Sequence, residues 1–249
     1  ITFEEHQKII QRELNPSTNE SGASSVAEGG SKPDATVAFK GVQANVTVIA
    51  VGLSPSKQLW EDAALVRAYI NQRLPYMVRF REQGELLSGN GVWPDIEGIL
   101  TMSDKQTQDA VNTDSAQTIG MAIAKIENVD GTASGVALNP TDAWAMFTKR
   151  ASDSGVFDAG NPYSMSAVDA LTVWGLPTVR SRVHASGTGV VADFARGAMI
   201  LDREQVNVQI FEQHSIYAAE NTIYVRCESR FGLAVWRPDY FVSTTLQTS

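Results

Sequence analysis

The sequence predicts an α+β fold, in which helices and strands follow one another without the regular alternation of a parallel-sheet protein. Three observations predict it. Residues 61–88 have the apolar spacing of one long helix, β-branched runs elsewhere have the alternation of strands, and no internal repeat of about 20 to 50 residues is found. The 249 residues suffice for one large domain or two modest ones.

The first part of the chain predicts a long hairpin with a polar tip. Residues 15–25 are polar or small and offer almost nothing to bury. The flanking residues 8–14 and 35–42 alternate enough to form its two arms. A disordered linker is the alternative on composition alone. A β-branched run then begins at residue 46 and is typical of a buried strand.

Residues 61–88 give the strongest helical pattern. Apolar residues recur there at spacings of three and four, which places them on one stripe. They are Val66, Ile70, Leu74, Met77, Phe80, Gly84 and Leu87. Pro75 lies inside the stretch, and since an interior proline costs a helix about 3 kcal/mol, we expect a bend near residues 71–75.

The remainder of the chain predicts shorter elements. Residues 115–127 and 139–150 have helical spacing, and the second begins with the helix-start sequence Asn-Pro-Thr. Residues 152–166 are rich in Gly, Asp, Asn and Pro and predict a surface loop. Short strands are expected at residues 135–138, 190–194, 198–201, 206–210, 223–227, 233–235 and 241–242.

Composition excludes several classes of protein. The net charge of −8 argues against a dedicated grip on nucleic acid. The single cysteine, Cys227, excludes an internal disulfide, and the three histidines have no ligand spacing. No apolar run approaches the roughly 18 residues of a membrane span. We expect a soluble, intracellular protein without metal or cofactor, from which a leader before Ile1 has been lost.

Motifs of the common enzyme classes are missing from the sequence. It contains no G-x-S-x-G, no G-x-x-x-x-G-K-[ST] and no H-E-x-x-H. Residues 187–192 match the loose G-x-G-x-x-A dinucleotide pattern, but strand-like residues follow where a helix is needed. Glu212 and His214 are too close on one strand for an acid–base pair. Arg180 and Arg182 are expected to face carboxylates of a neighbour.

An ordered set of short motifs carries a family resemblance. The motifs are VAEGGSKPD (26–34), AYINQRL (68–74), GELLSGNG (84–91), IEGI (96–99), LNP (138–140), WGLPTV (174–179), DR (202–203), RCESR (226–230) and WRP (236–238). In this order the chain resembles the major capsid proteins of tailed bacteriophages, which have the Hong Kong 97-type capsid fold. The resemblance covers residues 26–242, and the family's N-terminal arm has no counterpart in the sequence.

The resemblance implies a division into three parts. Residues 1–44 would form the extended loop (E-loop), a hairpin lying over a neighbouring subunit. Residues 45–94 and 200–233 would form the peripheral domain, with the spine helix at 61–87. Residues 95–199 and 234–249 would form the axial domain.

The resemblance also implies a structural function. The chain would be a major capsid protein that self-assembles into hexamers and pentamers of an icosahedral phage head around double-stranded DNA, without sequence-specific DNA binding. Portal, scaffold or maturation protease would be its partners, and it would assemble in the host bacterial cytoplasm, reside in the virion and bind no membrane. The alternatives are a cellular encapsulin-type compartment, against which the long polar tip argues, a gene-transfer-agent particle, and a monomeric soluble enzyme.

Three residues match those that lock the shell in crosslinking members of the family. There a loop lysine attacks an asparagine side chain of another subunit, an isopeptide bond forms, ammonia leaves, and a glutamate of a third subunit moves the proton. The matching residues are Lys32, Asn221 and Glu228. Asn221 and Glu228 are seven apart, and on one strand they would point to opposite faces, so only an assembly would bring such groups together.

Two neighbouring residues leave a second interpretation open. Glu204 and Arg226 stand where crosslinking relatives carry apolar residues that keep the site dry, and a lysine in contact with water stays protonated. The same lysine, asparagine and glutamate recur in non-crosslinking relatives, where they pair electrostatically. The sequence therefore predicts either an autocatalytic crosslink or a non-covalent contact around an exposed Lys32.

Overall fold

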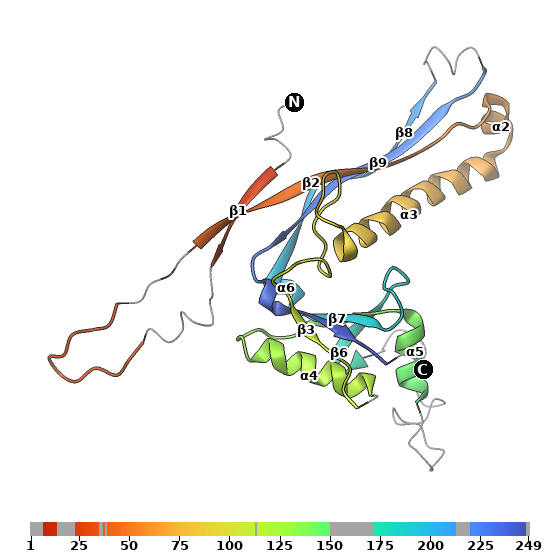
Figure 1. The fold of residues 1–249 in the computed structure, drawn as a ribbon. Helices are drawn as coiled ribbons and strands as arrows, with labels where there is room; N and C mark the ends of the chain where they lie inside the picture. Colours follow the sequence, from red (N-terminus) through yellow and green to blue (C-terminus); the bar gives the residue numbers. More distant parts are fainter. Residues whose placement is uncertain are drawn as a thin grey trace. The chain divides into compact units, whose positions relative to one another are not determined.

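The computed structural model describes residues 7–13, 23–34, 37, 39–112, 114–149, 172–212 and 220–247. Helices and strands alternate irregularly along the chain (Figure 1), which confirms the predicted α+β class. The elements are β1 (Gln7–Glu13), β2 (Phe39–Leu53), α2 (Lys57–Asp62), α3 (Ala64–Ser88), β3 (Gln106–Gln108), α4 (Ser115–Glu127), β4 (Gly135–Leu138), α5 (Pro140–Thr148), β5 (Thr172–Val173), β6 (Leu176–Arg180), β7 (Thr188–Ala192), α6 (Phe194–Gly197), β8 (Ala198–Phe211), β9 (Tyr224–Val235), η3 (Pro238–Tyr240) and β10 (Phe241–Thr245). The predicted surface loop at 152–166 lies outside the described residues.

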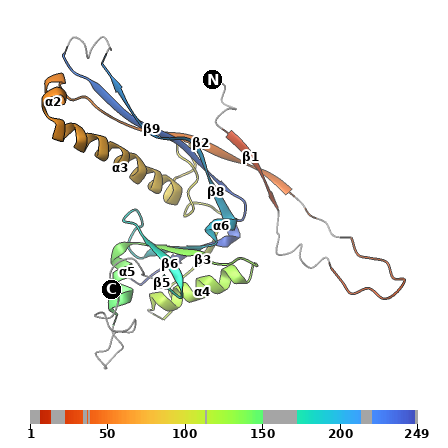
Figure 2. The same cartoon turned by 180° about the vertical axis from the view of Figure 1, so that it is seen from behind.

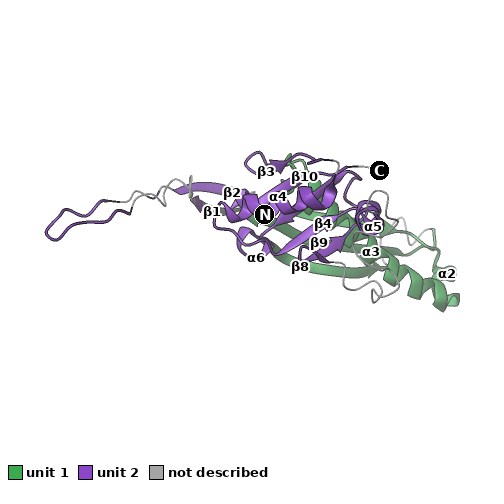
Figure 3. Ribbon diagram, turned by 90° about the horizontal axis from the view of Figure 1, so that it is seen from below, with its two compact units in different colours: residues 1–8, 44–101, 200–234 green, residues 9–43, 102–199, 235–249 purple. Residues whose placement is uncertain are grey.

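The chain forms two compact units (Figure 3). Unit 1 consists of residues 1–8, 44–101 and 200–234, and unit 2 of residues 9–43, 102–199 and 235–249. The strands form a four-stranded sheet, in the order β1-β2-β9-β8, and a six-stranded sheet, in the order β3-β10-β7-β4-β6-β5. Four of the five unit boundaries fall inside strands, namely β1, β2, β8 and β9, and the fifth lies between residues 101 and 102.

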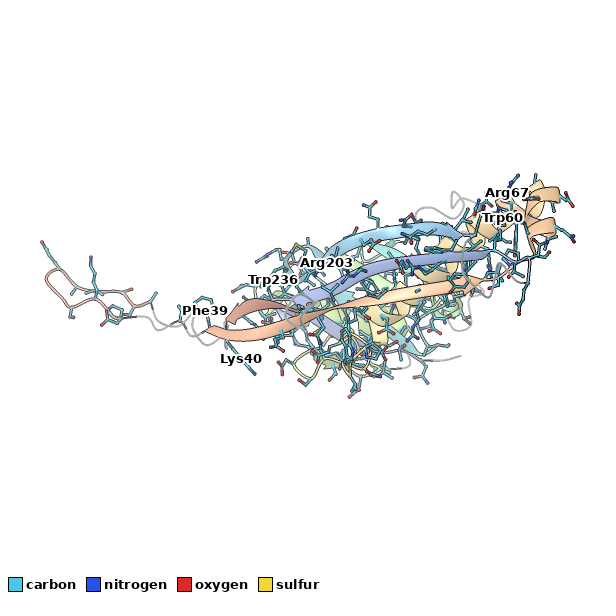
Figure 4. All side chains as sticks on the ribbon, turned by 90° about the horizontal axis from the view of Figure 1, so that it is seen from above. Phe39, Lys40, Trp60, Arg67, Arg203 and Trp236 are labelled. Atoms are coloured by element: carbon cyan, nitrogen blue, oxygen red, sulfur yellow. The ribbon has the colours of Figure 1, made fainter. Side chains whose placement is uncertain are left out.

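The strand after the polar segment is longer than the sequence pattern predicts. β2 is one strand of 15 residues, and it joins the expected hairpin arm at 35–42 to the expected strand at 46–51. β1 lies beside it in the sheet, as the two arms of a hairpin would. In Figure 4 the side chains of Phe39 and Lys40, at the start of β2, point to opposite sides, as the strand pleat requires.

Two helices occupy the stretch predicted as one. α2 begins where the Ser56 hydroxyl accepts a hydrogen bond from the Leu59 N–H, and Ala63 separates α2 from α3 with non-helical backbone angles. α3 then runs without a break from Ala64 to Ser88, through Pro75, and Figures 1 and 2 show an uninterrupted ribbon there. The helix therefore continues through its proline, and the bend expected near residues 71–75 stays a prediction.

The core of unit 1 lies between α3 and the sheet. Ile70, Leu74 and Val78 of α3 pack with Val225 and Cys227 of β9. Trp60 of α2, labelled in Figure 4, belongs to the same core.

The predicted stripe on α3 is wrong in its second half. Val78 is buried where Met77 was expected, and Glu85 is buried where Gly84 was expected. The buried residues at 70, 74 and 78 follow a strict spacing of four, whereas the predicted stripe took a step of three to residue 77, which is also apolar. Arg81 compensates the buried Glu85 carboxylate with an ion pair one helical turn away.

The core of unit 2 lies between α4 and the six-stranded sheet. Ile119, Ala122 and Ile126 of α4 are fully buried against Val136 of β4 and Val242 of β10. α4 has the bounds that the sequence predicts. α5 begins at Pro140, where the Asn139 side chain accepts a hydrogen bond from the Thr141 N–H at 2.8 Å.

A buried carboxylate fixes the segment between β6 and β7. Asp142 of α5 accepts hydrogen bonds from the Ser186 hydroxyl at 2.7 Å and the Gly187 N–H at 2.8 Å. His184 of the same segment is buried, and its Nδ1 has no hydrogen-bond partner in the described part of the chain. Burial lowers the pKa of His184, although the nearby Asp142 carboxylate opposes the shift.

Two leucines of α3 test the position of the helix on its sheet. Leu74 is 4% exposed and Leu65 is 85% exposed. We expect Leu74→Ala to reduce the free energy of unfolding by about 2–5 kcal/mol, because it leaves a cavity, and Leu65→Ala to change it by less than about 0.5 kcal/mol. Urea unfolding of the unassembled chain, followed by tryptophan fluorescence, measures both. Equal losses would contradict the assigned core.

The buried His184 predicts a loss of stability in acid. Because its pKa is lower in the folded chain than in the unfolded chain, the unfolded chain binds the extra proton first as the pH falls. Stability should therefore decrease as the pH falls through about 6.5, the ordinary pKa of histidine. His184→Gln should reduce this decrease, measured by urea unfolding between pH 7.5 and 5, whereas His6→Gln should preserve it. An unchanged pH profile in His184→Gln would show that this histidine does not titrate as proposed.

Candidate functional site

The candidate site lies on the face of the unit 1 sheet that points away from α3. Alternate residues of β9 point to the two faces: Val225, Cys227 and Ser229 are buried on the α3 side, and Tyr224, Arg226 and Glu228 lie on the other. We call this second side the outer sheet face; Gln209 and Phe211 of β8 also contribute to it.

Arg226 is the centre of the outer sheet face. Its Nη2 donates hydrogen bonds to Gln209 Oε1 at 2.8 Å and to Glu228 Oε1 at 2.9 Å. Its guanidinium group also lies over the Phe211 ring, 5.0 Å from the centroid. The Glu228 side chain is 19% exposed and is therefore a partly buried carboxylate held by a neighbouring cation.

A glycine of β2 makes room for the aromatic part of this face. Gly52 pairs with Arg226 across the β2–β9 ladder. A Cβ atom at residue 52 would lie 2.0 Å from the Tyr224 hydroxyl, so any other residue here would force the Tyr224 ring to move. The Tyr224 and Phe211 rings are in turn 6.4 Å apart, which is within the range of aromatic pairs.

Asn221 does not lie on the strand that carries Glu228, contrary to the prediction. β9 begins at Tyr224, and Asn221 sits in the preceding turn with a φ of +50°, a left-handed conformation that asparagine tolerates. Its carbonyl accepts a hydrogen bond from the Lys57 N–H at 2.9 Å, which ties this turn to the start of α2. Its side chain is exposed, so the amide is accessible at the end of the strand.

Lys32 belongs to a different part of the chain. It lies in the segment 23–34, whose residues are all exposed and whose one described backbone hydrogen bond closes a turn from Ala27 to Gly30 at 2.9 Å. Lys32 is in unit 2, whereas Asn221 and Glu228 are in unit 1. The chain thus carries the three predicted residues on three separate elements.

Glu204 and Arg226, the two polar residues expected to keep this site in contact with water, lie on different sides of the sheet. Arg226 lies on the outer sheet face, but Glu204 lines a cleft of about 370 Å³ between α3 and β8, together with Glu82 and Asp202. Glu204 therefore lies on the α3 side of the sheet, away from Glu228. The importance of Arg226 could have been found from sequence, because residues 226 and 228 of one strand share a face.

The other candidates from sequence have structural explanations. Gly187, Thr188 and Gly189 lead into β7, not into a helix, and a Cβ at Gly189 would lie 2.6 Å from the Leu138 side chain. Arg180 lies over the Trp144 ring at 5.7 Å. Glu212 is exposed at the end of β8, and His214 lies outside the described residues.

The described part of the chain has neither a cluster of metal ligands nor a helix that could span a membrane. Within the described ranges, His, Cys, Asp and Glu side chains form no group of three or more suited to a metal ion. Among the helices so described, none is long and apolar enough to span a membrane.

Comparison with known proteins defines the family. The chain matches the phage capsid family over residues 7–246. It is 30% identical over 225 residues to the major capsid protein of Enterobacteria phage HK97, covering 90% of this chain and 57% of that protein. The chain therefore belongs to the phage capsid family, a family of structural proteins and not of enzymes.

Solved structures support the fold. A chain of Gordonia phage Cozz superposes with a TM-score of 0.75 at 17% identity, covering 97% of this chain and 81% of that chain. The capsid of an empty GTA particle superposes with a TM-score of 0.70 at 16% identity, covering 100% of this chain and 87% of that chain. The expected Hong Kong 97-type fold is thereby confirmed. The chain nevertheless spans little more than half the length of its HK97 relative.

Proposed function

We propose that the chain is a major capsid protein whose copies assemble into the hexamers and pentamers of an icosahedral phage head around double-stranded DNA. The observation that carries the proposal, beside family membership, is the segment 23–34 before β2, in which every residue is exposed. A hairpin without a core is only marginally stable in water. Another copy of the chain would supply the surface that this segment lacks.

The two units fit the division expected for such a subunit. Unit 1, with α3, would be the peripheral domain, and the part of unit 2 after residue 101 would be the axial domain. Residues 1–44 would be the E-loop. Portal, scaffold and maturation protease would be partners in the host cytoplasm before the particle is complete, and the finished protein would reside in the virion.

A gene-transfer-agent shell is the second candidate function. The capsid of a GTA particle has the same fold as this chain, which supports it as an alternative. The same subunit contacts would serve both particles, and they differ in the DNA that is enclosed. The encapsulin and enzyme alternatives have no comparable support among the described features.

We further infer that Lys32, Asn221 and Glu228 meet where copies of the chain touch. The geometry of Glu228 favours a non-covalent contact there. Its Oε1 already accepts a charge-assisted hydrogen bond from Arg226, so the carboxylate is held in an ion pair within its own chain. Lys32 is exposed and would pair with the carboxylates of another copy while still charged.

Assembly itself tests the proposed function. Expression of the chain with whatever segment precedes Ile1 in its gene should give rings or closed shells in electron micrographs. It should also give a large species in gel filtration, because the exposed segment 23–34 would pack on a neighbouring copy. A single species near 27.0 kDa, without rings or shells, would contradict the capsid function and favour a monomeric protein.

Denaturing electrophoresis distinguishes a non-covalent contact from an isopeptide crosslink. Mature particles boiled in detergent should run as one band near 27.0 kDa, because ion pairs do not survive this treatment. A ladder of multimers that Lys32→Ala abolishes and Lys40→Ala preserves would instead establish the isopeptide bond. Lys40 is a suitable control because it is also exposed, at the start of β2.

A further inference from the structure

β8 is an edge strand of the unit 1 sheet. The strand order β1-β2-β9-β8 places β9 on one side of it (Figure 1), and no strand in the described part of the chain pairs with its other side. β8 is 14 residues long, and the N–H and C=O groups of alternate residues point to that other side. We call this side the free edge of β8. A row of unpaired main-chain groups of this kind can pair with a strand from another chain.

β8 lacks the devices that commonly protect an exposed edge from other strands. Protected edges are short, or they carry proline, lysine or a bulge. β8 is long, and its sequence contains no proline, lysine or glycine. Its charged residues are Asp202, Arg203 and Glu204, which alternate between the two faces of the sheet. The free edge is therefore open, and these charges determine which strands it can accept.

The two carboxylates of β8 lie on the α3 side of the sheet. Asp202 and Glu204 line the α3–β8 cleft together with Glu82, and Arg79 is the cationic residue that lines it. Glu82 already accepts a hydrogen bond from the Ser229 hydroxyl. The side chains of Asp202 and Glu204 form no ion pair or hydrogen bond with any residue that the structure describes. The cleft thus carries more negative than positive charge, and two of its carboxylates are available to a partner.

Apolar side chains complete the lining of the cleft. Leu86 of α3, Val206 of β8 and Phe231 of β9 all contribute, and Phe231 is 4% exposed. The volume of about 370 Å³ is large enough for a long side chain. Lysine and arginine suit such a lining, because their methylene groups pack on apolar surface while the charged end stays beside polar groups.

We propose that the free edge of β8 binds an extended segment of another polypeptide chain, as an added strand with lysine or arginine at alternate positions. Main-chain hydrogen bonds would hold the segment, and its alternate side chains would enter the cleft beside Asp202 and Glu204. The same carboxylates disfavour pairing with the β8 edge of a second copy, which would bring its own two carboxylates to the contact. The inference goes beyond the proposed function, because the free edge belongs to each single chain.

A pair of synthetic peptides tests the added strand. The probe is a fluorescein-labelled peptide of sequence TTKTKTT, whose two lysines share one face when the peptide is extended. The matched peptide has the same sequence with N-methyl groups on its threonines, which removes main-chain donors and keeps the charge. Fluorescence anisotropy with the full, unassembled chain at low salt should show binding of the first peptide only, since an added strand depends on main-chain hydrogen bonds.

Removal of the two carboxylates tests the preference for basic side chains. Asp202→Asn with Glu204→Gln should weaken binding of the unmethylated peptide by roughly 3- to 10-fold, because each exposed ion pair contributes only a little. The matched control, Glu61→Gln with Asp62→Asn, removes the same charge from exposed residues of α2 and should preserve the affinity. Urea unfolding of both double variants shows that they are folded.

Three results would overturn the inference. They are a wild-type chain that does not bind the unmethylated peptide, equal binding of the two peptides, and an unchanged affinity in the Asp202→Asn, Glu204→Gln variant. Equal binding of the two peptides would mean attraction between charges without an added strand. Since the chain is unassembled in this experiment, none of these results bears on whether it forms shells. Electron micrographs decide that question separately.

Discussion

The register of β9 is the constraint on which unit 1 depends. β9 pairs with β2 so that Val51 lies opposite Cys227 and Ala50 opposite Glu228. One set of its side chains completes the core under α3, and the alternate set forms the outer sheet face around Arg226. A slip of one residue would expose the first set and bury the second, including an arginine and a glutamate. The energetic penalty of burying these charges makes the register unambiguous.

A unit of only two layers has consequences for what its surfaces can do. The sheet and α3 each bury one side against the other, so unit 1 has two extended faces that remain available to partners. The faces differ in chemistry: on the outer sheet face Arg226 is paired with Glu228, whereas the side of α3 that points away from the sheet carries the exposed Tyr69 and Tyr76 rings. The two faces are therefore suited to partners of different chemistry, and a shell wall likewise has two sides.

The sequence predicted elements well where one local pattern determines them. α4 and β4 have the predicted bounds, since capping residues and apolar periodicity agree there. Prediction failed where the answer depends on a neighbouring element. Val78 replaces Met77 in the core because the sheet sets the rotation of α3. Asn221 falls outside β9 because a hydrogen bond from α2 holds it in a turn. β2 and β8 are also longer than their apolar patterns predict, because pairing with neighbouring strands extends them.

At the candidate site, family motifs identify the residues but do not predict their interactions. The motif matches located Lys32, Asn221 and Glu228, but their chemistry depends on the residue two positions before the glutamate. Alternation along a strand puts Arg226 beside Glu228, so this carboxylate already belongs to an ion pair with a guanidinium group. A lysine arriving from another copy would thus join an existing charge network at the sheet surface. The contact between copies would then be reversible, and its strength would depend on salt, as it does for any exposed ion pair.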